Sequence, residues 1–89
     1  MSTQVTHALK TWPEYFEEMR EGRKKFEIRY NDRAFRVGDI LLLREYLPTT
    51  KCYTGRELKA VVTYMLDFHV GLVDGYVGMS IELLDDLPF

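Results

Sequence analysis

Cysteine and histidine are scarce in this chain, and long apolar runs are absent. The single cysteine, Cys52, excludes an intramolecular disulfide, and isolated cysteines are typical of reducing compartments. His7, His69 and Cys52 are too scattered for metal-ligand spacing. No apolar run approaches the ~20 residues that cross a bilayer, and the first residues lack the charged-then-apolar layout of a secretion signal. The sequence therefore predicts a cytoplasmic protein without a membrane segment, a metal or a cofactor.

Length and composition predict one globular domain over residues 1–89. Hydrophobic residues make up 46% and charged residues 29% of the 89 residues, which is ordinary for a soluble protein. A chain of this length buries roughly 60% of its unfolded surface, enough for one core. No internal repeat or low-complexity linker divides it.

The net charge is small, but the charged residues are unevenly distributed along the chain. The net charge of −2 argues against a general polyanion binder. Residues 20–36 nevertheless hold seven of the twelve basic residues, whereas residues 67–89 hold five acidic residues and neither Lys nor Arg. We therefore expect a locally positive region on an acidic body.

The firmest local prediction is a helix that begins near Thr11 and ends at Gly22. Thr11 and Glu14 have the spacing of a capping box, and Pro13 suits the first turn. An apolar stripe at helical spacing predicts the buried side, with Trp12 and Phe16 packing on the sheet; its members are Trp12, Tyr15, Phe16 and Met19. Gly22 suits the left-handed position that ends a helix.

Strand-like runs fill the rest of the chain. Phe26, Ile28 and Tyr30 alternate with Glu27 and Arg29, which predicts a strand whose apolar residues face the core. Further strands are expected at 40–46, 57–66 and 76–83, with a short one near 5–9 and a loop over 47–55. One N-terminal helix packed on about five mostly antiparallel strands predicts an α+β fold, a small β-barrel.

The basic strand is the main candidate for chemistry. Period-2 geometry places Lys25, Glu27 and Arg29 on one face, with Lys24 at the preceding turn. One interpretation is a solvated strand face whose ion pairs contribute roughly 0–1 kcal/mol each. The other is a pocket where Lys and Arg hold an anion and Glu accepts from a ligand donor. Composition alone leaves both open.

The same segment resembles a known family. Gly22, Lys24, Glu27 and Arg29 match the G-x-K-x-x-E-x-R signature of the ASCH family, a branch of the PUA-like barrels. Further blocks resemble a small ASCH-like family of unknown function in phages and their bacterial hosts. They are Leu9-Lys10-x-Trp12-Pro13, Asn31-Asp32-Arg33-x-Phe35-x-Val37-Gly38-Asp39, Leu43-Arg44-Glu45-Tyr46 and Tyr53-Thr54-Gly55-Arg56.

The resemblance implies a PUA-like β-barrel, a cleft lined by the signature and a role in RNA binding. Some ASCH-type proteins instead hydrolyse the N4-acyl amide of modified cytidine, and others act as nucleases. In the amidohydrolase branch the residue at the Lys24 position matters for catalysis. The amidohydrolases have a Thr at the position of Glu27, so this sequence departs from the amidohydrolase branch. The amidohydrolase branch also uses a carboxylate further along the chain. Three residues could take that place here: Glu57, Asp67 and Asp74.

Other residues extend the candidate site. Arg33, Arg36 and Arg56 are basic residues in or near turns, where they either contact phosphates or form surface ion pairs. Tyr53, in a polar loop, is the best of the five tyrosines outside the predicted helix for stacking on a base. The expected ligand contacts are thus Lys24, Lys25, Glu27, Arg29, Arg33, Tyr53 and Arg56, with Lys24 and Glu27 catalytic if the protein is an enzyme.

Three functions follow from these patterns. The first is a module that binds RNA or a nucleotide ligand. The second is a small hydrolase of a modified nucleoside or of RNA. The third is a phage-related adaptor that binds a protein. A walled pocket around Lys24, Glu27 and Arg29 would favour a small ligand or an enzyme. An open positive groove past Arg33 and Arg36 would favour a nucleic-acid chain.

Overall fold

The computed structural model describes residues 4–84. The elements follow one another as β1 (Thr6–Thr11), α1 (Pro13–Arg20), β2 (Phe26–Tyr30), β3 (Ile40–Leu47), β4 (Cys52–Leu66) and β5 (Tyr76–Leu83). Asp85 and Asp86 of the acidic segment lie outside the described residues. Among residues 4–84 no helix is both long and apolar enough to cross a membrane.

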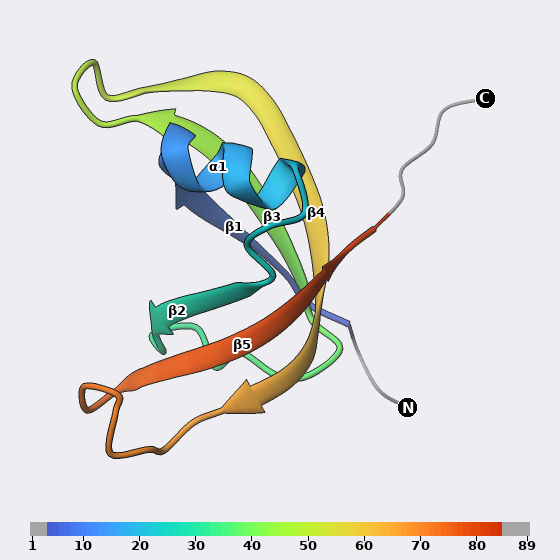
Figure 1. Cartoon of the computed structure of the whole chain (residues 1–89), viewed down its shortest axis with the longest axis vertical. Helices are drawn as coiled ribbons and strands as arrows, with labels where there is room; N and C mark the ends of the chain where they lie inside the picture. The colour runs from blue at the N-terminus through green and yellow to red at the C-terminus, as the bar shows by residue number, and fades with distance from the viewer. Residues whose placement is uncertain (1–3, 85–89) are drawn as a thin grey trace.

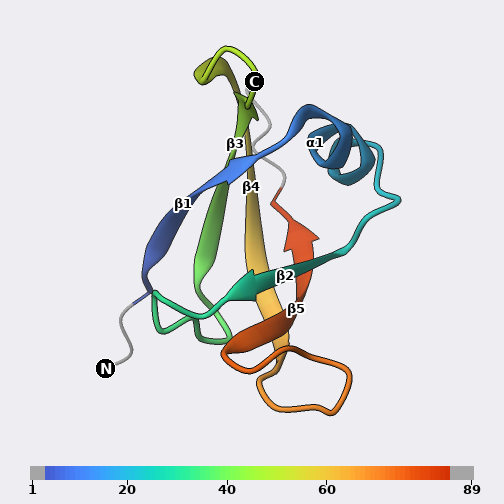
Figure 2. The same cartoon turned by 90° about the vertical axis from the view of Figure 1, so that its left-hand side faces the viewer.

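The five strands form one sheet in the order β1-β3-β4-β5-β2. β1 pairs with β3 in parallel, and the other three pairings are antiparallel. Irregular register near Tyr46 and near Thr63 bends the long β3–β4 ladder, as β-bulges do. The sheet curls until its edge strands, β1 and β2, face one another (Figures 1 and 2). The result is a half-barrel, so the α+β class and the mostly antiparallel sheet are confirmed.

The core lies on the concave side of this sheet. Its largest fully buried side chains include Leu41 and Leu43 of β3, Met79 of β5 and Met19 of α1. α1 packs against β3 and closes one end of the curl (Figure 2). Phe16 is buried as expected, but the prediction for Trp12 was wrong because that side chain is half-exposed.

Both ends of the helix were tested by the structure. The N-cap residue is Trp12, with no side-chain cap, so the predicted capping box of Thr11 and Glu14 was wrong. Thr11 belongs to β1 instead, and its extended backbone points the side chain into the protein. At the other end Gly22 has φ of +82° and its N–H donates to the Met19 carbonyl at 3.0 Å, which confirms the predicted stop.

The most consequential correction concerns the faces of β2. Phe26, Ile28 and Tyr30 were predicted to face the core, yet all three are at least half exposed. Glu27, on the opposite face, is only 4% exposed. β2 is an edge strand on the curl, and its concave side looks into a polar opening beside β1. The polar face therefore turns inward and the apolar face outward.

The loop prediction over 47–55 was also too long. β3 runs to Leu47 and β4 begins at Cys52, so the connection is a short turn over 48–51. Tyr46 pairs with Tyr53 across this hairpin. The predicted early strand near 5–9 is confirmed as β1, which continues to Thr11.

Candidate functional site

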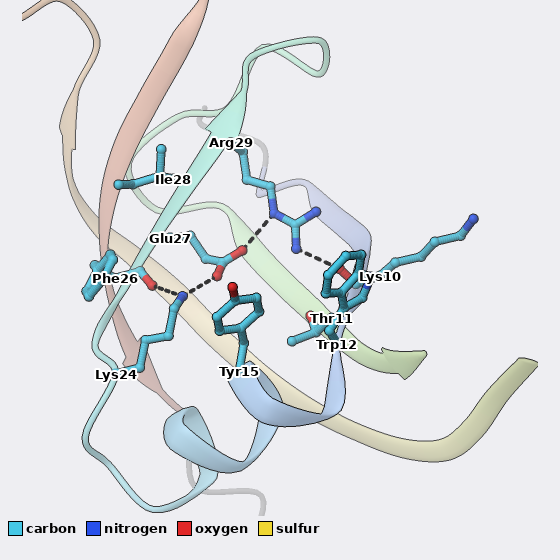
Figure 3. Close-up of a pocket in the computed structure, with 9 residues that line it drawn as sticks. All are labelled: Lys10, Thr11, Trp12, Tyr15, Lys24, Phe26, Glu27, Ile28 and Arg29. Carbon is cyan, nitrogen blue, oxygen red and sulfur yellow. Dashed lines mark hydrogen bonds and ion pairs between the residues drawn. The ribbon is translucent and has the colours of Figure 1, made fainter. Parts of the chain in front are cut away.

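A pocket of about 380 Å³ lies where the open side of the half-barrel meets the start of α1. β1, α1 and β2 each supply part of its wall (Figure 3). Nine residues line it: Lys10, Thr11, Trp12, Tyr15, Lys24, Phe26, Glu27, Ile28 and Arg29. The structure thus brings Lys24, Glu27 and Arg29 of the predicted site together around one hollow.

Glu27 is the centre of the polar wall. Lys24 Nζ donates to its Oε1 at 2.8 Å, and Arg29 Nε donates to its Oε2 at 2.7 Å. A buried carboxylate needs such partners because its desolvation is otherwise costly. Both oxygens are therefore engaged within the protein, and the pocket presents donors more readily than acceptors.

Lys24 and Arg29 also bind main-chain carbonyls. Lys24 Nζ donates to the Phe26 carbonyl at 2.7 Å. Arg29 Nη2 donates to the Lys10 carbonyl at 2.7 Å, which links β2 to β1 across the open side. Because β1 and β2 do not pair as strands, this guanidinium replaces part of the missing ladder.

Arg33 makes a second link of the same kind. Its Nη1 donates to the Ala8 carbonyl at 2.6 Å. Arg29 and Arg33 thus both bind the free edge of β1. They donate to main-chain oxygens that would otherwise face water. Arg33 does not line the pocket, so its observed contact is with the protein scaffold.

Aromatic rings form the apolar part of the lining. Trp12 and Tyr15 are nearly parallel, at 16°, with ring centroids 6.5 Å apart. Lys24 Nζ lies 4.7 Å from the Phe26 ring centroid and 5.7 Å from that of Tyr15. Each ring is about half exposed, so the pocket offers both π-faces and cations to a ligand.

Thr11 adds an unsatisfied group to the lining. Its Oγ1 is fully buried and has no hydrogen-bond partner among the described residues. Such groups are uncommon, because an unpaired buried hydroxyl costs free energy. The capping role predicted for Thr11 therefore gives way to a position in the pocket wall.

The remaining predicted contacts lie elsewhere. Lys25 is exposed beside the pocket and does not line it. Tyr53 lies at the β3–β4 hairpin, where the Arg44 guanidinium sits 3.9 Å from its ring centroid and Tyr46 packs edge-on. Tyr53 thus packs against other residues of this hairpin. The hairpin lies at the opposite end of the sheet from the residues that follow Leu66 (Figure 1).

Arg56 joins β4 to the helix through an ion-pair network. Its Nε donates to Glu45 at 2.9 Å, and its Nη2 contacts Glu17. Hydrogen bonds from Arg20, and then from Arg56, lower the pKa of Glu17 to about 2. The hydrogen bond from Arg56 also lowers the pKa of the buried Glu45. Arg56 is therefore bound to Glu17 and Glu45, outside the pocket.

The sequence interpretation missed much of the lining. Lys10, Tyr15 and the pocket-facing positions of Thr11 and Trp12 were not predicted. A signal existed for two of them, because Lys10 and Trp12 belong to the first block of the family resemblance. Tyr15 had no such signal, since its helical spacing suggested a place in the core.

The three carboxylates considered as a second catalytic group lie away from the pocket. Glu57 pairs with Arg44 at 3.1 Å, and Asp67 and Asp74 line a separate small hollow beside the β4–β5 loop. Glu27 is thus the one carboxylate among the described residues that lines the main pocket. Within residues 4–84 no group of three or more His, Cys, Asp or Glu is arranged to hold a metal ion.

Comparison with known proteins places these residues in a family. The family model described as a domain of unknown function, DUF3850, matches residues 6–81. A protein of Escherichia phage P2, described as an uncharacterized 12.9 kDa protein in the GpA 3′ region, is 35% identical over 82 residues. That alignment covers 92% of this chain and 72% of the phage protein. The match to the family model includes every residue that lines the pocket.

Proposed function

This chain belongs to the DUF3850 family, and we propose that its pocket binds a single nucleotide, presented as an unpaired residue of RNA. The observation that carries the proposal is the joining of half-exposed aromatic rings and cations around one hollow of about 380 Å³. This volume lies near the lower end of the usual range for small-ligand sites. It suits one base with its sugar and phosphate.

The aromatic rings would bind the base. Trp12 and Tyr15 present their rings to the pocket, whereas Phe26 lines its edge from the outward face of β2. Base stacking on an aromatic side chain contributes about 1–3 kcal/mol. Stacking tolerates any base, so sequence preference would depend on the polar wall.

The cations would bind the phosphate or the base carbonyls. Lys10, Lys24 and Arg29 outnumber the single carboxylate of Glu27 in the lining. Arg29 uses Nε and Nη2 within the protein, which leaves Nη1 for a ligand. Charge-assisted bonds of this kind are the stronger class of hydrogen bond.

The proposal favours one nucleotide over an extended chain. Neither Arg33 nor Arg36 lines the pocket, and Arg33 is engaged with the Ala8 carbonyl. A long phosphate track past these arginines is therefore not part of it.

Binding also accounts for the polar wall better than hydrolysis does. Lys24 Nζ directs hydrogens at Glu27 and at the Phe26 carbonyl, whereas a general base needs a free lone pair aimed at the substrate. Glu27 has both oxygens engaged, and no second carboxylate of the described residues lines the pocket. In this arrangement Lys24 and Glu27 bind a ligand and do not catalyse its hydrolysis.

We further infer that the family is an ASCH-type branch of the PUA-like barrels. The inference is supported by the signature residues, since Gly22 ends α1 and Lys24, Glu27 and Arg29 meet at the pocket. A curled five-stranded sheet with a short helix at its open side also suits such a barrel.

Trp12 provides the test, because it is the sole tryptophan and it lines the pocket. Its fluorescence is followed during titration with nucleoside monophosphates and with six-residue single-stranded RNA. We expect quenching that saturates, with a salt slope of about −0.7 to −1.4 for one or two phosphates. The RNA should bind more tightly than the free nucleotides.

Two variants assign the binding to the pocket. Lys24→Ala should weaken binding at least ~10-fold, a loss of about 1.4 kcal/mol. Lys59→Ala removes the same charge from an exposed position on β4, outside the pocket, and should leave binding unchanged. The absence of saturable quenching with every ligand, or equal effects of the two variants, would reject the proposal.

A further inference from the structure

The outer face of strands β4, β5 and β2 is apolar and uncovered. Register places Tyr64, Ser80 and Phe26 in one row across the three strands, and Leu66, Gly78 and Ile28 in the next. Tyr76 and Tyr30 form a third row. The alternate residues of β5, from Val77 to Ile81, face the buried core. We define the aromatic face as Phe26, Ile28, Tyr30, Tyr64, Leu66 and Tyr76.

This face is large for a chain of 89 residues. Tyr30 is 56% exposed and Tyr64 is 62% exposed. An aromatic side chain buries about 150–250 Å² when fully covered. Four rings that are 38–62% exposed and two aliphatic side chains therefore present roughly 500 Å². A patch of that size is near the upper end for a monomer, about 300–600 Å². It is also close to what one partner contributes to a small protein interface.

The six residues of the face are uncharged, with the Lys24 ammonium 4.7 Å from the Phe26 ring centroid at its border. Its two ends carry opposite charges. At the end where β2 begins, Lys25 and Lys59 outnumber Glu82. The Lys25 and Lys59 carbonyls accept from the N–H groups of Ile81 and Leu84, which places the main chain of both residues at that end. At the other end, acidic residues outnumber Arg33. They are Asp32, beyond Tyr30, Asp67, beyond Leu66, and Asp74, just before Tyr76.

We propose that the aromatic face binds a second copy of this chain, with the β2 strands of the two copies antiparallel. A two-fold axis in the plane of the interface, perpendicular to the strands, stacks one face on the other. It also lays the end with Lys25 over the partner's acidic end, near Asp74. The same patch then supplies the apolar contact and the complementary charges on both copies.

The charges argue for this occupant over a nucleic acid. Single-stranded RNA would also stack on exposed aromatic rings, but its phosphates would meet three carboxylates at one end of the face. In the dimer those carboxylates meet lysines. Phe26 and Ile28 also line the edge of the pocket, but the proposal does not require that the pocket binds a nucleotide.

Sedimentation equilibrium of the full chain over micromolar to several hundred micromolar concentrations tests the association. We expect a reversible monomer–dimer equilibrium that nuclease treatment does not alter. Tyr64→Asp places a carboxylate in the first row of the face and should raise the dissociation constant at least ~10-fold, equivalent to about 1.4 kcal/mol. Tyr53→Asp makes the same change elsewhere on β4 and should leave the constant unchanged.

Charge reversal tests the arrangement. Lys25→Glu should weaken the dimer, and adding Asp74→Lys to the same chain should restore it. Thermal melts of each variant report whether the monomer still folds, as expected for exposed positions. A chain that stays monomeric at every concentration overturns the proposal. An unchanged or tighter dimer with Lys25→Glu overturns the antiparallel arrangement.

Discussion

Arg29 donates from Nε to the buried carboxylate of Glu27 at 2.7 Å, and the same guanidinium reaches the Lys10 carbonyl on the facing strand. One side chain thus orients the pocket's carboxylate and holds together the two edges of the half-barrel. The candidate site and the closure of the fold depend on the same contacts.

Replacing Glu27 should therefore weaken the fold as well as the site. Glu27→Gln leaves Lys24 and Arg29 close together without the carboxylate between them, and breaking a buried ion pair costs about 3 kcal/mol or more. Urea unfolding measures the loss. Glu14→Gln, at an exposed helix position, should change the unfolding free energy by no more than ~0.5 kcal/mol. Similar effects of both changes would contradict the role given to Glu27.

The inverted faces of β2 make a second prediction. Ile28→Ala should cost little, within ~0.5 kcal/mol for a surface change, because Ile28 is half exposed. Met79→Ala on the neighbouring strand should cost about 2–5 kcal/mol, since Met79 is fully buried. Both are measured by chemical denaturation at low micromolar concentration, where any association is minimal. A large loss for Ile28→Ala would mean that the apolar face of β2 is buried after all.

The same strand shows why sequence reasoning succeeded in part. Alternation in β2 correctly predicted a two-faced strand, and Lys24, Glu27 and Arg29 do lie together. Alternation cannot say which face is inside, and the usual rule assigns the apolar side to the core. Here the polar side turns inward because Lys24 and Arg29 neutralise Glu27, and Arg29 comes within reach of Lys10 only when the sheet curls.

Long-range partners were beyond the reach of local patterns. Arg56 is 39 residues from Glu17 in the chain, so nothing in its neighbourhood indicated that the helix would engage it. Trp12 fitted a helical stripe, yet it is the N-cap residue with an extended backbone. Its side chain therefore leaves the stripe and joins the pocket.

Gly75 supports a third prediction. It has φ of +86°, and a Cβ built there would lie 2.7 Å from Tyr30 Cε1. Gly75→Ala therefore combines backbone strain with a clash. Gly55 has φ of +96° and nothing within 4 Å of its Cβ position, so Gly55→Ala reports strain alone, about 1–2 kcal/mol.

Thermal or urea unfolding should show a loss for Gly75→Ala at least ~1 kcal/mol larger than for Gly55→Ala, the usual scale of overpacking. Removing the ring by Tyr30→Ser in the Gly75→Ala background should recover part of that difference. Equal losses for the two glycine variants would show that the Tyr30 ring moves away without cost.

The ion-pair network of Arg56 predicts acid sensitivity. The pKa of Glu17 falls from 4.5 to about 2 on folding, chiefly through Arg20 and Arg56, and that of Glu45 is lowered chiefly by Arg56. A carboxyl whose pKa is lower in the folded state stabilises the fold above its ordinary pKa, and this stabilisation is lost as the pH falls. The unfolding free energy should thus decrease from about pH 4.5 towards pH 2.

Arg56→Met should flatten this pH dependence, because both carboxyls lose their shared cation. Arg44→Met removes a guanidinium that pairs with the exposed Glu57 and should leave the slope unchanged. Melting temperatures measured at intervals from pH 6 to pH 2 give the comparison. Parallel profiles for the wild type and Arg56→Met would contradict the assignment.

Chemical-shift mapping tests the central claim most directly. The ¹⁵N-labelled chain is titrated with a six-residue single-stranded RNA, and the perturbed amides and the Trp12 indole are recorded. The account predicts perturbations confined to residues 10–15 and 24–29, with the Trp12 indole among the largest and Lys24→Ala suppressing them. Perturbations centred on Arg33, Arg36 or Tyr53, or none at saturating RNA, would contradict it.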